Sequence, residues 1–133
     1  MTINQRTDYA FRTVLFLAKQ KESSLVMAQD IAKSEVIPMR YLLKIMPSLI
    51  KAGIVTSVRG VGGGYALAKD AREITLLDIL EAVEGPIKLN RCLVSPDLCS
   101  KNGSATCEIH AAMAQIQSRL RLDFQSYVVA DLI

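Results

Sequence analysis

The part of the sequence with the clearest capacity for chemistry is a cluster of thiols in its second half. Cys92, Cys99 and Cys107 are the three cysteines of the chain, and His110, its one histidine, follows the last of them by three residues. Thiolates are soft ligands that select iron–sulfur clusters or zinc over hard cations. Structural zinc sites usually begin with two cysteines separated by about two to four residues, whereas six and seven residues separate neighbouring cysteines here. The wide spacing favours a flexible loop around a cofactor larger than one ion.

Other uses of these thiols remain open from their number and spacing alone. Three cysteines cannot all pair within one chain, and a reducing cytoplasm disfavours disulfides. A zinc site that only stabilises the fold, or a thiol redox switch without metal, would use the same residues. A cysteine enzyme would need a base beside its nucleophile, and only Cys107 and His110 could form that pair, with no glycine-rich oxyanion loop next to them. We therefore expect a metal-binding or thiol-based sensor and not an enzyme.

A glycine-rich segment, SVRGVGGGYALAK, precedes the cysteines and invites comparison with nucleotide-binding loops. A G-x-G-x-x-G pattern that starts at Gly60 needs its third glycine where Tyr65 stands, and no Gly-Lys-Ser/Thr follows. The flanking runs, Ile54–Val58 and Tyr65–Leu67, are short and contain β-branched and aromatic residues. Because glycines permit positive φ at a tight tip, the segment predicts a β-hairpin.

Apolar residues at helical spacing predict five helices around this hairpin. Their expected bounds are Thr7–Lys19, Ala28–Ser34, Pro38–Gly53, Ile74–Gly85 and Glu108 to about Val129. Pro38 suits the first turn of a helix, where its missing N–H costs nothing, and Gly53 suits a left-handed cap. Pro47 should remove one hydrogen bond inside the third helix and bend its axis. Thr75 and Asp78 form a capping-box pattern at the start of the fourth helix.

The order of helix, short helix, tight turn, longer helix and hairpin predicts a winged helix-turn-helix, a mainly α fold with a small β-hairpin wing. In this fold the N-terminal residues of the third helix lie nearest the bases in the major groove of DNA. The candidate DNA-binding residues are Met39, Arg40, Tyr41 and Lys44 on that helix and Arg59, Gly62 and Gly63 on the wing. Arg40 could reach a guanine edge or a phosphate, and Arg59 could enter a narrow minor groove. Arg40 and Lys44 could also be two solvent-exposed cations on a helix without any function. Their combination with a wing favours DNA binding.

The charge distribution agrees with a polyanionic partner for the first half of the chain. Residues 1–72 carry 11 Lys/Arg against 5 Asp/Glu, a net +6, and residues 73–133 carry a net −3. We expect residues 1–72 to form the DNA-binding domain, and residues 73–133 to form the cysteine-loop and dimerisation-helix region of the same compact unit. No apolar run approaches the roughly 18 residues that span a bilayer, and the first residues lack a signal-peptide pattern. We therefore expect a cytoplasmic protein without a membrane partner.

The predicted last helix has an apolar stripe along most of its length. Its members, three or four residues apart, are Ile109, Met113, Ile116, Leu120, Phe124 and Tyr127. A domain this small cannot bury the whole stripe, whereas a second copy of the helix could. We expect a homodimer that uses the first five of these residues. Its two recognition helices would lie about one DNA turn apart on a palindromic operator of double-stranded DNA. Packing of the stripe within one chain is the alternative.

Four segments and the cysteine loop together resemble one known family. TDYAFR, YLLKIMPSLIKAGIV, SVRGVGGGYALAKD and ITLLDILEAVEGP occur in that order before the three cysteines, and the resemblance covers nearly the whole chain. The family is the Rrf-two family of bacterial winged helix-turn-helix regulators, which includes IscR, NsrR and RirA. The resemblance implies a homodimeric transcriptional regulator, here expected to be a repressor. Its DNA binding would respond to iron, redox state, oxygen or nitric oxide through a two-iron or four-iron cluster.

By position, the resemblance assigns the three cluster ligands of the family to Cys92, Cys99 and Cys107. The fourth ligand stays open between His110, because some relatives use a histidine there, and Asp8, which matches an acidic residue that some relatives contribute from the opposite subunit. A histidine would suit a two-iron cluster and an aspartate a four-iron cluster. Taken alone, His110 is as readily a packed or capping residue and Asp8 a charge at a helix N-terminus. Some relatives have a tighter C-x5-C-x5-C spacing, so the resemblance leaves the cluster type open.

Overall fold

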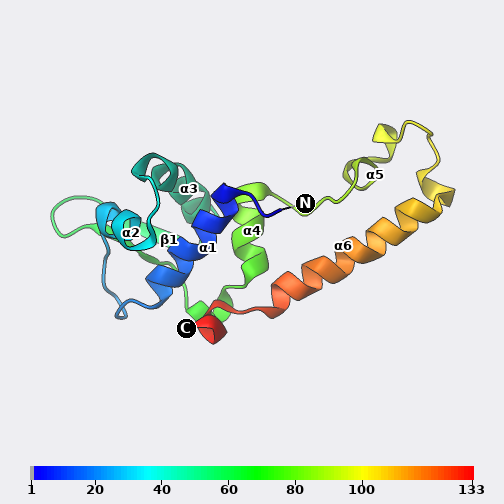
Figure 1. Ribbon diagram of the computed structural model, residues 1–133. Coiled ribbons are helices and arrows are strands. Elements are labelled where there is room, and N and C mark those ends of the chain that lie inside the picture. Colours follow the sequence, from blue (N-terminus) through cyan, green and yellow to red (C-terminus); the bar gives the residue numbers. More distant parts are fainter. Residues whose placement is uncertain (1) are drawn as a thin grey trace.

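Three helices and a hairpin form the N-terminal part of the molecule, in the order that the sequence predicts. The computed structural model describes residues 2–133. The elements are α1 Gln5–Ala18, α2 Ala28–Glu35, α3 Met39–Lys51, β1 Val55–Val58 and β2 Gly64–Leu67. With α4 (Leu76–Glu84) they build a head, residues 2–84, from which a long arm, residues 85–126, projects (Figure 1). The expected mainly α architecture with a two-stranded wing is confirmed.

Short-range interactions explain where the first helices begin and end. The Asn4 side chain caps α1 by accepting the backbone N–H of Thr7 at 2.9 Å. Helix α3 begins at Met39, one residue after the expected start at Pro38, which is its N-cap; as expected, the helix continues through Pro47. It ends before Gly53, which has a φ of +74°. This left-handed conformation costs glycine little, so the predicted cap is confirmed.

The wing is wider at its base than the hairpin alone. β1 and β2 pair antiparallel, with Val55 opposite Leu67. Val26 joins them as an isolated bridge and exchanges backbone hydrogen bonds of 2.8 and 2.7 Å with Tyr65. A Cβ atom on Gly64 would lie 2.6 Å from the Val26 carbonyl oxygen. This close approach explains why the hairpin has glycine where its second strand begins.

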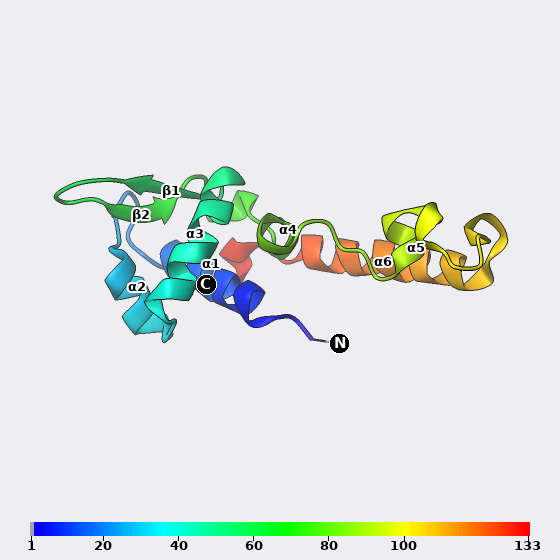
Figure 2. The same ribbon diagram turned by 90° about the horizontal axis from the view of Figure 1, so that it is seen from above.

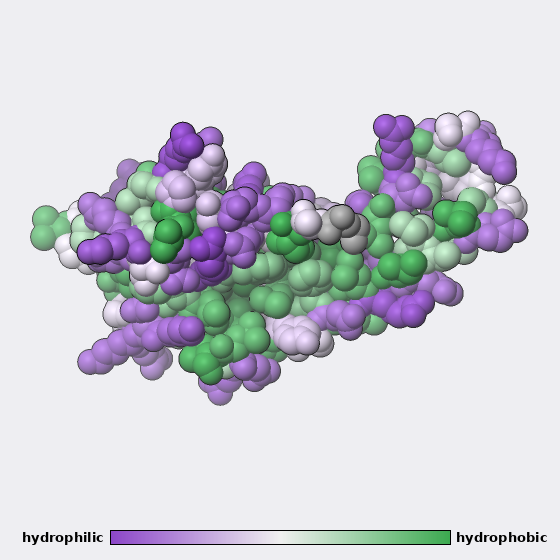
Figure 3. Space-filling view, in the orientation of Figure 1, coloured by the Kyte–Doolittle hydropathy of each residue, from purple (hydrophilic) through white to green (hydrophobic). Residues whose placement is uncertain are grey.

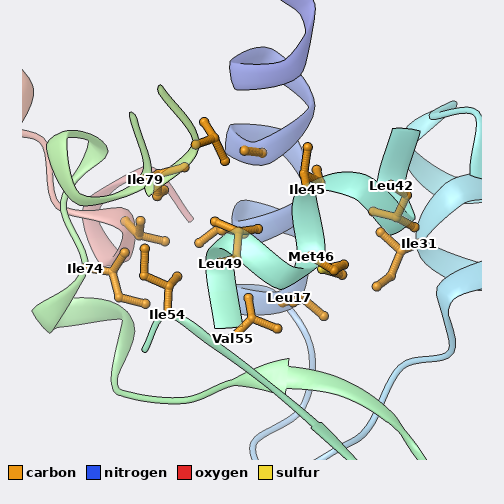
Figure 4. Close-up of a cluster of buried hydrophobic side chains, with 14 of the residues drawn as sticks. Leu17, Ile31, Leu42, Ile45, Met46, Leu49, Ile54, Val55, Ile74 and Ile79 are labelled. Carbon is orange, nitrogen blue, oxygen red and sulfur yellow. The ribbon is translucent and has the colours of Figure 1, made fainter. Parts of the chain in front are cut away.

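The core of the head lies where α1, α3, α4 and the start of β1 meet (Figure 4). The fully buried side chains that the figure labels include Ile31, Leu42, Ile45, Met46, Leu49, Ile54, Val55, Ile74 and Ile79. Burial of each side chain of this kind contributes about 1.5–3 kcal/mol. Helix α4 begins with the predicted capping box, in which Thr75 and Asp78 bond each other's backbone N–H groups at 3.1 and 2.9 Å. Helix α4 packs on α1 and α3 as part of the head.

The arm holds the cysteine segment at the end of the molecule opposite the wing (Figure 2). Its helices are α5 (Arg91–Val94) and α6 (Glu108–Ser126). Single 3₁₀ turns are η1 Ala71–Glu73, η2 Pro96–Leu98, η3 Ser104–Thr106 and η4 Val129–Leu132. None of the residues of α6 is buried. Within the described residues, every helix is too short or too polar to cross a membrane.

The last helix ends at Ser126, three residues before the expected position near Val129. The backbone N–H of Leu76 donates to the Tyr127 carbonyl at 2.9 Å, and the N–H of Val129 donates to the Ile74 carbonyl at 2.8 Å. The Val129 side chain is buried in the core of the head. The expectation that Tyr127 continues the helical stripe was therefore wrong, because burial of Val129 turns the chain away from the helix axis. The arm is thus anchored to the head at both of its ends, through residue 85 and through this turn.

Candidate cofactor pocket and DNA-binding surface

The three cysteines and the histidine line one pocket at the far end of the arm. Cys92 lies in α5, Cys99 follows η2, Cys107 caps the start of α6, and His110 lies in the first turn of α6. The pocket has a volume of about 230 Å³. Its other lining residues are Asn90, Arg91, Leu98, Ser100, Ser104 and Ile109. The structure therefore brings together four predicted ligands that span nineteen positions of sequence.

The loop after Cys99 surrounds its sulfur with hydrogen-bond donors. The backbone N–H groups of Gly103 and then Lys101 hold the pKa of the Cys99 thiol below its ordinary value. Asn102, between them, has a φ of +53°, which turns the chain back towards the cysteine. All three cysteines are free thiols of intermediate exposure. This arrangement favours a thiolate at Cys99, the form in which cysteine binds metals.

Two polar atoms of the pocket are buried without a partner. They are Nδ1 of His110 and Oγ of Ser104, neither of which has a hydrogen bond among the described residues. A buried polar atom left in this way costs about 1–3 kcal/mol, so it requires an explanation. No three His, Cys, Asp or Glu side chains in residues 2–133 are placed to surround a single metal ion. Three soft sulfur donors and a free imidazole nitrogen around one pocket fit an iron–sulfur cluster in donor chemistry.

Asp8 lies in the head and does not line this pocket. Its carboxylate accepts hydrogen bonds from Nε and Nη2 of Arg12 at 3.0 and 2.8 Å, and the Asp8 side chain is half exposed. Within one chain, the structure groups His110 with the cysteines and leaves Asp8 apart. A role for Asp8 as a ligand thus requires a second subunit.

Arg12 connects α1 to the turn of the helix-turn-helix, a role that the sequence analysis missed. Its Nη1 donates to the carbonyl of Glu35, the last residue of α2, at 2.6 Å. Its guanidinium carbon also lies 4.9 Å from the centre of the Tyr9 ring. The spacing of Asp8 and Arg12, four residues apart in a helix, could have indicated the ion pair. The contact with a backbone carbonyl 23 residues away has no signal in the sequence.

The N-terminal part of α3 exposes three of its four predicted DNA-binding residues. Arg40, Tyr41 and Lys44 are exposed, whereas Met39 is half-buried and packs against the core. Arg40 lies over the Tyr41 ring at 4.8 Å, which holds both side chains on the same face. Tyr41 is in turn 6.0 Å from the ring of Tyr9. A cavity of about 670 Å³ between α1 and α3 is lined by Gln5, Arg6, Tyr9, Tyr41, Lys44 and Ile45.

The wing exposes Arg59 and forms its tip from glycines. Gly62 has a φ of +77°. A Cβ atom on Gly63 would lie 2.2 Å from the Val58 carbonyl oxygen, so the turn itself requires this glycine. Val61, which directly precedes Gly62, is fully exposed. The turn geometry thus explains why positions 62 and 63 are glycines, independently of any DNA contact.

The predicted dimerisation stripe divides into two sets. Ile109 and Ile116 are 66% and 47% exposed. Met113, Leu120 and Phe124 are half-buried on the helix that contacts α4 and α5 of the same chain. Hydrophobic side chains continue from the head along the arm (Figure 3). The arm therefore exposes apolar surface that its own chain does not cover.

A winged helix-turn-helix head on a cysteine-bearing arm defines the class of this protein: it is a DNA-binding transcriptional regulator and not an enzyme. Solved regulators share the fold over nearly the whole chain. CymR, the global cysteine regulator of B. subtilis, has a TM-score of 0.79 and 26% identity and covers 99% of this chain and 95% of its own. IscR of T. potens has a TM-score of 0.78 and 24% identity and covers 99% of this chain and 85% of its own.

The chain belongs to the Rrf2 family, whose model, described as an iron-dependent transcriptional regulator, matches residues 3–133. An HTH-type transcriptional regulator of Aquifex aeolicus (strain VF5) is 34% identical over the whole chain and 92% of its own length. The HTH-type transcriptional regulator IscR of Cronobacter sakazakii (strain ATCC BAA-894) is 31% identical over the whole chain and 80% of its own length. The family expected from the sequence is thereby confirmed.

Proposed function

We propose that this protein is a repressor whose affinity for its operator is controlled by an iron–sulfur cluster held at the end of the arm. The observation that carries the proposal is the single pocket lined by Cys92, Cys99, Cys107 and His110. The similarity to proteins named IscR supports it. When bound, such a cluster would supply a centre that responds to iron, redox state, oxygen or nitric oxide.

Residues of the pocket would bind the cofactor through sulfur and nitrogen atoms. Cys92, Cys99 and Cys107 would bind it as thiolates, and the amides after Cys99 stabilise that thiolate. His110 is our first choice for the fourth ligand, because its Nδ1 is buried in this pocket without a partner. Asp8 of a second subunit is the alternative ligand.

The DNA-binding surface would consist of α3 and the wing. Arg40 would contact a guanine edge or a phosphate, and Tyr41 and Lys44 would contact phosphates. Arg59 would enter the minor groove. Met39, Gly62 and Gly63 remain weaker candidates, because packing and turn geometry already account for them.

A homodimer would form through the exposed face of α6. Ile109 and Ile116 would lie at its centre, and Met113, Leu120 and Phe124 would complete the contact from the half-buried side. Two-fold symmetry would place two α3 helices about one DNA turn apart, which requires a palindromic operator.

Regulation would depend on the two connections between arm and head. A change in the cysteine loop would act on the head through Gly85 at the end of α4 and through the anchor at Val129. A coupling free energy of only about 1–2 kcal/mol would change operator affinity roughly 5- to 30-fold.

Anaerobic purification of the full chain tests the proposal. Iron, acid-labile sulfide and visible absorbance are measured, and operators are selected from a random duplex pool with both the cluster-loaded and the cluster-free protein. We expect iron and sulfide on the wild type and a difference in affinity between the two forms. Replacement of the three cysteines by alanine should abolish the binding of iron and sulfide and the difference in DNA affinity. The head should stay folded. A wild type without iron or sulfide that still responds to the cellular signal would contradict the proposal.

A thiol switch without metal is the second candidate, favoured by the lowered pKa of the Cys99 thiol. The structural similarity to a global cysteine regulator agrees with it. Titration of free thiols on cluster-free protein, before and after a mild oxidant, separates the two. Reversible loss of thiols with a matching change in DNA affinity, and no iron on anaerobic protein, would favour this candidate.

A further inference from the structure

Ser104 has a buried hydroxyl in the pocket, and the proposed function gives this hydroxyl no role. Ser104 lies at the start of η3, three residues before Cys107, and lines the same pocket as the three thiols. Its hydroxyl oxygen is buried and has no hydrogen-bond partner among the described residues. A buried polar group of this kind requires an explanation.

Local structure does not account for this hydroxyl. Serine at the start of a helical turn usually accepts a backbone N–H, but η3 has no side-chain capping bond and its cap is Gly103. Water does not reach the hydroxyl oxygen, because it is buried. Ser100 provides an internal comparison, since it lines the same pocket but is exposed.

The surroundings of Ser104 point to the Cys99 sulfur as its partner. The chain from 100 to 104 folds around that sulfur, and its backbone amides already donate to it. The Ser104 side chain is among the groups that lower the pKa of the Cys99 thiol, although its hydroxyl oxygen has no partner within ordinary hydrogen-bond geometry. A sulfur bound to iron carries the negative charge of a thiolate, and hydrogen bonds to charged acceptors are shorter and stronger than those to neutral ones.

We propose that the Ser104 hydroxyl donates a hydrogen bond to the Cys99 sulfur when the cofactor is bound, and that this bond sets the reduction potential of the cluster. The inference rests on the proposed function. Ser104 would be a positioning residue and not a ligand. Hydrogen bonds to sulfur are one of the factors that fix the potentials of iron–sulfur proteins.

The direction of the effect follows from charge. In the test, one electron passes from an added reductant to the cluster, and no covalent bond forms or breaks. The added negative charge is shared by the sulfurs, so a donated hydrogen bond stabilises the reduced form more than the oxidised form. Removal of the Ser104 hydroxyl should therefore lower the reduction potential and make the cluster harder to reduce.

Redox titration of three variants against the wild type tests this inference. Ser104→Ala removes the hydroxyl, Ser104→Thr retains it, and Ser100→Ala removes the neighbouring exposed one. All are purified anaerobically, assayed for iron and sulfide, and titrated with dithionite and redox dyes by absorbance and electron paramagnetic resonance. We expect equal iron and sulfide in all four proteins. At a fixed solution potential, the ratio of reduced to oxidised cluster should fall about tenfold in Ser104→Ala, which equals about 59 mV for one electron. Ser104→Thr and Ser100→Ala should match the wild type.

Four outcomes would overturn the inference. Equal potentials in Ser104→Ala and the wild type, both with full iron and sulfide, would reject the role of Ser104 and leave the proposed function intact. An equal shift in Ser100→Ala would show a general effect of the pocket. Loss of the cluster in Ser104→Ala would indicate a structural role. A wild type without iron and sulfide would reject both proposals.

Discussion

The head and the arm of this molecule are built on different principles. The head buries a continuous set of aliphatic side chains contributed by α1, α3, α4 and β1. The arm has a helix of 19 residues without one buried side chain, and a loop that surrounds a pocket with thiols. The head therefore has a buried core of its own, whereas the arm leaves apolar side chains exposed and two polar atoms without a partner among the described residues.

Two kinds of partner are suggested by what the arm exposes. Along α6, apolar side chains such as Ile109 and Ile116 face outwards, and a monomer rarely keeps an extended apolar patch open to water. At the far end, the unpartnered atoms are polar, and three thiols and an imidazole line the same pocket. A second copy of the chain would satisfy the first feature and a metal cofactor the second.

The largest effect on stability should come from the core of the head. Leu49 is fully buried in α3, so Leu49→Ala should lower the free energy of unfolding by about 2–5 kcal/mol. Leu43→Ala on the same helix is the matched control, because Leu43 is exposed, and it should change little. Urea unfolding followed by circular dichroism measures both. Equal effects of the two substitutions would show that the head does not depend on its core as described.

The corresponding substitution in the arm should affect association and not folding. Ile116→Lys places a charge in the proposed α6 interface and should raise the dissociation constant of the dimer about 100-fold, or about 2.7 kcal/mol. Gln115→Lys, at the neighbouring exposed position, should not change it. Sedimentation equilibrium across a range of protein concentrations measures the constant. A dimer of unchanged affinity in Ile116→Lys would place the interface elsewhere.

The head could be predicted closely because its signals are local. The capping box of Thr75 and Asp78 and the left-handed Gly53 act within a few residues, and both are present in the structure. The end of α6 could not be predicted, because it depends on the burial of Val129 in a core that residues between 10 and 83 form.

The candidate site shows the same limit. The types and spacing of the three cysteines and His110 predicted a shared pocket, since the intervening residues form one loop. The buried hydroxyl of Ser104 and the contact of Arg12 with a carbonyl of α2 depend on how loops fold in three dimensions. Neither residue belongs to a pattern that a single sequence reveals.

A smaller effect is expected from the contact that connects α1 to the helix-turn-helix. Arg12→Ala removes the bonds to Asp8 and to the Glu35 carbonyl, and should free the turn before α3. Since Arg12 is partly exposed, we expect a loss of about 1 kcal/mol in DNA binding, or roughly fivefold in affinity. Arg12→Lys, which keeps the charge but not the planar geometry, should recover part of it. DNA-shift assays on cluster-free protein measure the effect in the head alone. An unchanged affinity would mean that Arg12 does not position α3.

The smallest effect concerns the response of the head to acid. Asp70 caps η1 and accepts hydrogen bonds from the backbone and the side chain of Arg72, each at 2.8 Å. The side-chain hydrogen bond from Arg72 lowers the pKa of Asp70 from 3.8 to about 2. Because the pKa is lower in the folded state than in the unfolded chain, this stabilisation is present above about pH 4 and is lost as the pH falls through about 2. Both side chains are exposed to solvent, so salt should weaken the effect. Asp70→Asn should therefore reduce the steepness with which the urea midpoint falls below pH 4. Identical pH profiles for the variant and the wild type would mean that other carboxylates govern acid unfolding of the head.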